Sequence, residues 1–182
     1  AAAGYTHFLA LRNDGTVLAQ GGNGDGQLGD GTTLFRSAPV PVQGLSQVVA
    51  IAAGQWFSMA LKADGTVWAW GDNYYGAVGD DSGVDRLAPV QVLGLPPVVG
   101  ISAGVSSAYA WAADGSVFAW GLPNAGALGN GANTYTAVRR PIQVLAAQGD
   151  GFLSLQAVDS YPDPFALAPA FNAPPKFPRS VW

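Results

Sequence analysis

Residues 24–29 read Gly-Asp-Gly-Gln-Leu-Gly, which matches the Gly-x-Gly-x-x-Gly pattern of dinucleotide-binding loops. Such a loop must follow a strand and open a helix, because the helix N-terminus holds the pyrophosphate. The next residues, 31–42, contain Pro39 and Pro41 and have no helical period. The stretch also recurs as residues 74–79 and 124–129, which lose its first glycine and keep its last two. We therefore predict a turn here and no cofactor.

Four aspartates raise the question of a calcium site in one later loop. They are Asp72, Asp80, Asp81 and Asp85. A hard cation needs several oxygen ligands, but the spacing fits no standard calcium loop and the chain has no glutamate to act as a bidentate ligand. The sequence favours a solvated loop over a metal site.

Catalytic options are few, because the chain has one histidine, no cysteine and no glutamate. A Ser-His-Asp arrangement would need His7, but His7 lies in a strand pattern before Phe8 and Leu9. Residues 104–108 resemble a nucleophile elbow only loosely, since the last glycine is missing. We predict that His7 is structural and bonds a backbone group, and that the protein is not an enzyme.

Composition limits the possible partners and indicates the fold class. The net charge of −4 and the lack of any basic run beyond Arg139-Arg140 argue against a nucleic-acid partner. No apolar run approaches the roughly 18 residues of a membrane span. The chain has 25 glycines and 13 prolines and few strong helix formers, which predicts an all-β fold. Its lysine-poor composition favours a secreted or surface-exposed bacterial protein, so we expect an extracellular or cell-surface location.

The chain repeats with a period of fifty residues. Gly4, Gly54 and Gly104 are spaced by fifty, as are Asp14, Asp64 and Asp114. Within one copy, residues 57–61 and 66–70 read as two strands joined by a turn at Asp64-Gly65, where aspartate caps backbone amides. Residues 89–92 read as an edge strand that begins with Pro89, and residues 98–101 as a strand leading into the next copy. Four short strands per copy predict a β-propeller of four-stranded blades.

These residues also carry a family resemblance. The stretch AAGQWFSMALKADGTVWAWGDN, followed by GAVGD and PVQVLGL, resembles repeats of the regulator of chromosome condensation family. The resemblance covers residues 2 to 157 in three copies and implies a β-propeller, which in that family usually has seven blades. It implies a bias towards protein binding, and no exchange-factor residue maps onto this chain.

The chain has about three blades, and its two ends complement each other. The first copy begins at Ala2-Ala3-Gly4 and lacks the strand that precedes the other copies, whereas residues 152–157 repeat the pattern of residues 98–103. One interpretation is self-association, in which a second chain supplies the missing strand and a ring or filament forms. The other is a fragment of a larger binding propeller. The self-association residues are Ala2, Ala3, Gly4, Phe152, Leu153 and Leu155.

Residues 158–182 differ in character from the three repeats in residues 1–157. This tail has six prolines, a density that favours extended polyproline-II-like chain. Its aromatic residues indicate that it lies on an apolar surface, of its own chain or of a partner; an intersubunit strap and a linker are the alternatives. The predicted tail contacts are Phe165, Phe171 and Phe177.

Aromatic and arginine side chains outside the repeat pattern are the candidate recognition residues. Such residues are common interface anchors. The candidate partner-binding loop residues are Phe35, Arg36, Tyr74, Tyr75, Tyr135, Arg139 and Arg140. Two strands also carry an aromatic pair on one face, at Trp68 and Trp70 and at Phe118 and Trp120. We predict that these pairs pack between blades; a glycan-stacking platform is the rival interpretation.

Overall fold

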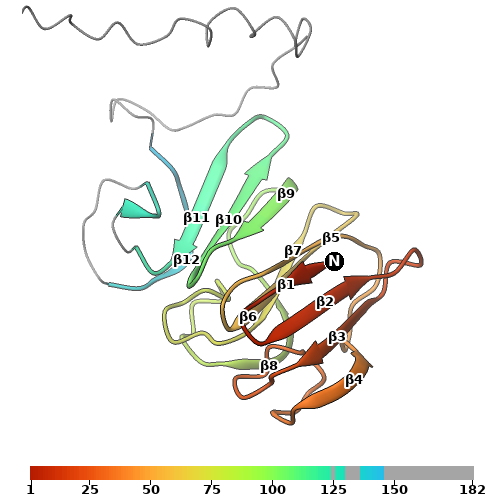
Figure 1. Cartoon of the computed structure of the whole chain (residues 1–182). Helices are drawn as coiled ribbons and strands as arrows, with labels where there is room; N and C mark the ends of the chain where they lie inside the picture. Colours follow the sequence, from red (N-terminus) through yellow and green to blue (C-terminus); the bar gives the residue numbers. More distant parts are fainter. Residues whose placement is uncertain (124–125, 130–135, 146–182) are drawn as a thin grey trace, which may run out of the picture.

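The computed structural model describes residues 1–123, 126–129 and 136–145, and over these ranges the chain forms three four-stranded antiparallel sheets (Figure 1). Each sheet is one blade, and its strands follow chain order from the centre outwards. Blade one contains β1 (Ala2–Ala3), β2 (His7–Leu11), β3 (Val17–Gly21) and β4 (Arg36–Pro41). Blade two contains β5 (Val48–Ala53), β6 (Phe57–Lys62), β7 (Val67–Gly71) and β8 (Arg86–Gln91). Blade three contains β9 (Val98–Ala103), β10 (Ser107–Ala112), β11 (Val117–Gly121) and β12 (Val138–Gln143).

The same aspartate-glycine turn joins the two middle strands of each blade. In blade two, the Asp64 carboxylate accepts hydrogen bonds from the backbone N–H of Thr66 at 3.0 Å and from its hydroxyl at 2.6 Å. Gly65 follows with a φ of 80°, a conformation that glycine adopts without strain. The Asp14 and Asp114 turns repeat the backbone contact. The predicted capping role of these aspartates is confirmed.

The outer strand of blade two differs from the predicted range 89–92, because it begins three residues earlier, at Arg86. A bulge between Ala69 and Gly71 lets the chain resume pairing at Gly71, opposite Arg86. Pro89 lies within this edge strand, where the missing N–H removes no ladder bond from the sheet interior, as predicted.

The hydrophobic core consists of two clusters, and each one fills a junction between neighbouring blades. The first contains Leu9, Val17 and Ala19 of blade one and Trp70 of blade two; the second has Met59, Val67 and Ala69 against Trp120 of blade three. The middle blade is therefore covered on both faces. Residues 57–61 of β6 are all buried, whereas β2 has buried His7 and Leu9 alternating with an exposed Phe8.

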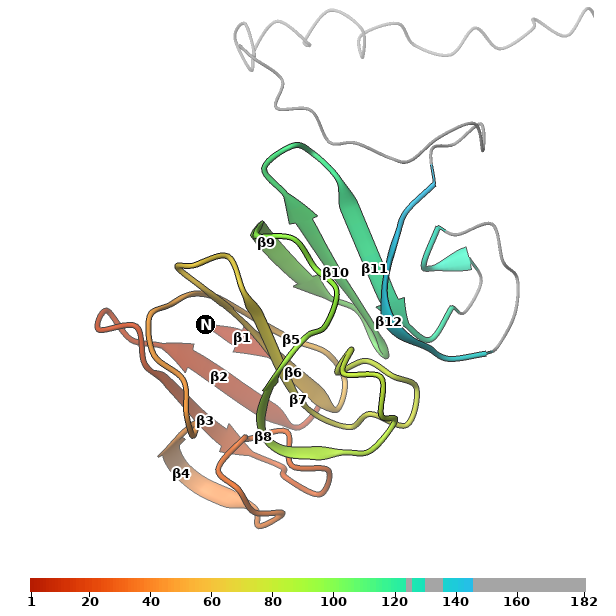
Figure 2. The ribbon, with the colours of Figure 1, turned by 180° about the vertical axis from the view of Figure 1, so that it is seen from behind.

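The inner strands β1, β5 and β9 bring the blades together around one side of the molecule, and the outer strands fan away from them (Figures 1 and 2). The three sheets cover an arc and do not close into a ring within the described ranges. Over the same ranges, no helix is long and apolar enough to cross a membrane.

Candidate functional site

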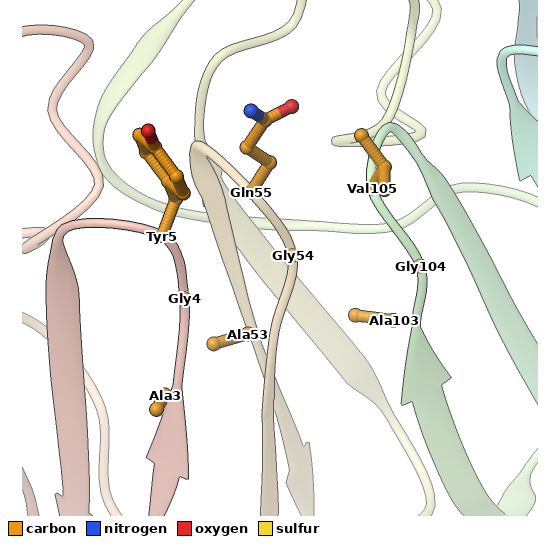
Figure 3. Close-up of a pocket in the computed structure, with 9 residues that line it drawn as sticks. All are labelled: Ala3, Gly4, Tyr5, Ala53, Gly54, Gln55, Ala103, Gly104 and Val105. Carbon is orange, nitrogen blue, oxygen red and sulfur yellow. The ribbon is translucent and has the colours of Figure 1, made fainter.

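An apolar cleft runs along the inner ends of the three blades, where the chain turns from the first strand of each blade into the second. Its volume is about 470 Å³, and its floor is made of the alanine-glycine steps that recur every fifty residues. Figure 3 shows Tyr5, Gln55 and Val105 at the tips of the three turns, above these steps. The small floor residues are required by packing, since a Cβ on Gly54 would lie 2.0 Å from the Phe57 ring.

The tips of these turns are tied to one another by backbone hydrogen bonds. The N–H of Tyr5 donates to the carbonyl of Gln55 at 3.2 Å, and the N–H of Gln55 donates to the carbonyl of Val105 at 3.0 Å. The Tyr5 ring also meets Trp56 edge to face, with centroids 5.1 Å apart and planes at 73°. Of this aromatic pair, Tyr5 lines the cleft. The pair was missed by the sequence analysis, because its members come from different copies and occupy non-equivalent positions.

The candidate loop residues have different environments. Phe35 and Tyr74 are each 70% exposed, and Tyr74 meets Tyr75 edge to face with centroids 4.8 Å apart. Arg36 forms an ion pair with Asp30 at 2.7 Å, and Arg140 forms one with Asp81 at 2.9 Å. Arg139 lies beside Gly76 and Gly83, and its carbonyl accepts the N–H of Asp81.

Tyr135 lies outside the described residues, as do Phe152, Leu153, Leu155 and the tail residues Phe165, Phe171 and Phe177. The binding role of the whole set stays a prediction.

Asn23, a buried residue that the sequence analysis did not identify, holds the long loop of blade one. The Asn23 side chain accepts the N–H of Leu28 at 2.9 Å and donates to Asp30 at 3.1 Å and to the Thr32 carbonyl at 2.9 Å. Burial alone would raise the pKa of Asp30, but hydrogen bonds from Thr32 and Arg36 outweigh it and hold that pKa below its usual value. The loop is therefore fixed by an asparagine, an aspartate and an arginine acting together.

Blade two repeats this arrangement with Asn73, Asp80 and Arg86, each fifty residues further on. Asp85 accepts the Asn73 N–H at 2.8 Å, and Asp72 accepts the Tyr74 N–H at 3.0 Å. The four aspartates considered for calcium are thus each engaged by protein donors, Asp81 through Arg140. Within the parts of the chain that the structure covers, no group of three or more potential ligands is placed to hold a metal ion.

His7 lies between blades one and two and is only 4% exposed. The Ser58 hydroxyl donates to the Gln27 carbonyl at 2.8 Å, so its oxygen accepts from His7 Nε2 at 2.9 Å. His7 is therefore the Nε2–H tautomer, and burial lowers its pKa to about 4. His7 is buried and joins two blades through a hydrogen bond, but the predicted backbone partner is wrong: the partner is a serine hydroxyl 51 residues away.

The indoles of Trp70 and Trp120 are fully buried between blades, where each N–H donates to a carbonyl of the preceding blade. Trp68 and Phe118 pack against the same two clusters while partly buried. The prediction that these pairs pack between blades is confirmed, and a buried indole face offers no platform for a sugar.

Within the described residues, β1 covers the inner edge of blade one only in part. β1 pairs only Ala2 with Leu9 and Ala3 with Phe8, whereas β5 continues along β6 as far as Lys62. A groove of about 600 Å³ lies beside the uncovered part of β2. It is lined by Leu11 and Arg12 on one side and by Gln47, Val48 and Val49 of blade two on the other.

Comparisons with known proteins agree with this geometry. The description "Regulator of chromosome condensation (RCC1) repeat" belongs to a family model that matches residues 14–61 and 64–111, and to a second model that matches residues 48–77. No curated protein sequence matches significantly.

Several solved structures are similar to the chain. Human WBSCR16 is 25% identical, with 79% of this chain and 38% of that chain covered and a TM-score of 0.70. Yeast RCC1 (Prp20), solved bound to Kap60, is 24% identical, with coverage of 80% and 36% and a TM-score of 0.71. Prp20p from Saccharomyces cerevisiae, described with its binding properties to Gsp1p and histones, is 23% identical, with coverage of 80% and 38% and a TM-score of 0.67. The chain thus spans between 36% and 38% of the length of these structures, and the likeness to Prp20 shows the fold alone.

Proposed function

The chain belongs to the regulator of chromosome condensation repeat family, and from this premise we propose that it is a non-catalytic protein-interaction module of the β-propeller type. In this proposal the interaction is self-association: the open edge of blade one takes a strand from a second copy. From composition we further propose an extracellular or cell-surface location.

The observation that carries the proposal is the difference between the first strands of the blades. β5 and β9 each have six residues, whereas β1 has two, and among the described residues Ala10 and Leu11 of β2 have no inner neighbour. An uncovered strand edge presents N–H and C=O groups that an added strand can pair. The groove beside this edge gives the added strand room for side chains.

The proposed donor is residues 152–155, because they match residues 98–101 of β9. In β5 and β9 the side chain at the first strand position (the first slot) is buried, with Val48 and Val98 each 4% exposed. The second slot faces solvent, with Val49 55% and Val99 59% exposed. Phe152 would take the buried slot and Leu153 the exposed one, and Ala2 and Ala3 would continue the same strand.

Light scattering coupled to size-exclusion chromatography of the 182-residue chain tests this proposal. We expect a dimer or a larger assembly, which Phe152→Asp reduces to a folded monomer because a carboxylate would enter the buried slot. The matched variant Leu153→Asp should still assemble, since its slot faces solvent. A wild-type chain that is monomeric at all concentrations tested, or equal behaviour of the two variants, would contradict self-association.

A second candidate function is recognition of a different protein, within a larger propeller, through the end of the blades that carries the long loops. Exposed Phe35 and Tyr74 favour it, since aromatic side chains often anchor interfaces. A photo-reactive residue placed at Phe35 should then crosslink a partner in the producing cells. The same group at Asn13, in a turn at the opposite end of blade one, should not.

A further inference from the structure

Tyr5, which lines the apolar cleft, and its neighbour Trp56 belong to neither of the hydrophobic clusters between the blades. We call Tyr5 and Trp56 the aromatic ledge. Tyr5 is 71% exposed and touches Trp56 only edge to face, so one face of its ring is available above the cleft. The alanines and glycines below the ledge leave a shallow apolar floor. Grooves of this kind, lined by aromatic rings, bind proline-rich segments in extended conformation.

Negative charge borders the ledge on the side of the long loops. The N–H of Asp72 donates to the Trp56 carbonyl at 3.0 Å, so this aspartate directly adjoins the ledge. Burial, followed by the charges of Asp72 and Asp85, raises the pKa of Asp25. Burial, with a smaller effect of Asp85, also raises the pKa of Asp72. Among the ion pairs of the described ranges, none involves these three carboxylates. A cation beside them would relieve their mutual repulsion.

The chain itself carries a segment of matching chemistry. Residues 174–179 read Pro-Pro-Lys-Phe-Pro-Arg and lie outside the described residues. A polyproline-II helix has three residues per turn, so Pro175 and Pro178 would share one face, and Lys176 and Arg179 the next. The first face is apolar and rigid, as an aromatic ledge requires, and the second carries two positive charges for an acidic border.

The length of the connecting chain permits this contact within one molecule. The last described residue is Leu145, which leaves 28 residues before Pro174. At about 3.1 Å per residue, an extended connection could span up to about 90 Å. That exceeds the diameter of a domain of this size, whose radius of gyration is about 15 Å.

We propose that the aromatic ledge and its acidic border bind the proline-rich, basic segment 174–179 of the same chain. The prolines lie on Tyr5 and Trp56, and Lys176 and Arg179 face the carboxylates of Asp25 and Asp72. This contact does not involve the edge of β2. A result that contradicts self-association would therefore not contradict this contact, and the reverse also holds.

Photo-crosslinking in the full chain tests the proposal. Benzoylphenylalanine in place of Phe177 should crosslink to tryptic peptides that contain Tyr5, Trp56 or Asp72. The same probe in place of Phe165 should crosslink to them at least fivefold less. With a mixture of isotopically light and heavy chains, the products should join peptides of one isotope, because the contact is within one molecule. Mixed-isotope products would overturn the intramolecular assignment, and crosslinks elsewhere or none would overturn the site.

Surface variants separate a specific contact from random encounter. Tyr5→Ser should lower the crosslink yield at least fivefold, whereas Phe35→Ser, an equally exposed aromatic residue on a loop of blade one, should leave it unchanged. Lys176→Gln with Arg179→Gln should lower the yield and make it insensitive to salt, because the attraction that salt screens is removed. Equal loss with Tyr5→Ser and Phe35→Ser would contradict the proposal. Both positions are exposed, so neither variant is expected to prevent folding.

Discussion

The two junctions between blades are built on one plan. We call the contact between blades one and two the first junction and that between blades two and three the second. In each, a buried indole donates to a carbonyl of the preceding blade, from Trp70 to Gln27 at 2.9 Å and from Trp120 to Ala77 at 2.8 Å. Each junction also has its own hydrophobic cluster made of equivalent positions.

Next to the buried indole, the two junctions have different side chains. The first has His7 against Ser58, joined by a buried hydrogen bond; the second has Phe57 and Ala108 at the equivalent positions, both buried and apolar. Both members of the pair change together between the junctions. The blade therefore tolerates either an apolar pair or a polar pair joined by one hydrogen bond, although His7 Nδ1 is buried and has no hydrogen-bond partner among the described residues. Removing the Nε2 bond as well would leave a second buried polar atom unpaired and would cost further stability.

The largest effect should come from removing what the junctions share. Trp70→Ala and Trp120→Ala each delete a fully buried indole, and each should lower the free energy of unfolding by about 3–5 kcal/mol. Urea unfolding followed by circular dichroism measures this, with exposed Leu34→Ala as the control. A loss below about 1 kcal/mol for either variant would mean that the blades do not depend on these junctions.

Placing only the histidine of the polar pair in the second junction should lower the free energy of unfolding nearly as much as the loss of a tryptophan. Phe57→His places an imidazole opposite Ala108, which offers no hydroxyl, and should lower the free energy of unfolding by about 3 kcal/mol. Adding Ala108→Ser recreates the pair of the first junction and should recover about 1 kcal/mol. The cycle is measured by urea unfolding of both single variants and the double variant. Additive effects of the two changes would show that the pair is not coupled.

The part of this architecture that repeats could be predicted from the sequence. The fifty-residue period gave the strands, the aspartate turns and the buried tryptophans, because the same physical requirement recurs in every copy. Asn23 and Asn73 also repeat, and their spacing could have revealed them, but Pro123 at the third position interrupts the signal.

What varies between copies could not be read in this way. The partner of His7 lies in another copy, and neither member of the pair is kept at the next junction. The pairing of Tyr5 with Trp56 depends on how two blades are oriented, which no local pattern encodes. The cleft and the groove are likewise produced by the arrangement of the blades rather than by any short motif.

Acid should weaken the first junction more than the second. His7 has a pKa of about 4 in the folded chain and an ordinary histidine value near 6.5 when unfolded, so the unfolded chain binds the proton more readily. The contribution of His7 to the free energy of unfolding is complete above about pH 6.5 and falls as the pH drops towards 4. Between pH 7.5 and pH 5 the free energy of unfolding should fall by about 2 kcal/mol from this group.

The variant His7→Phe, which copies Phe57 of the second junction, isolates this effect. Its unfolding free energy should be nearly level between pH 7.5 and pH 5, apart from the small slope that the aspartates contribute in both proteins. Urea unfolding at half-unit steps of pH measures the difference. Parallel profiles for wild type and variant would contradict the assignment of the acid sensitivity to His7.

The smallest expected effect distinguishes the two carbonyls that accept the indoles. Trp70→Phe and Trp120→Phe each keep a buried aromatic ring, lose the same part of the indole and remove its N–H donor. The Gln27 carbonyl retains the Ser58 hydroxyl at 2.8 Å, whereas Ala108 supplies no such donor to the Ala77 carbonyl. Trp120→Phe should therefore cost about 1 kcal/mol more than Trp70→Phe, because it leaves a buried acceptor without its side-chain donor. Urea unfolding of Trp70→Phe in a Ser58→Ala background is the check: removing the second donor should bring its cost up to that of Trp120→Phe. If the two single variants are equally stable, the hydroxyl of Ser58 does not compensate for the indole.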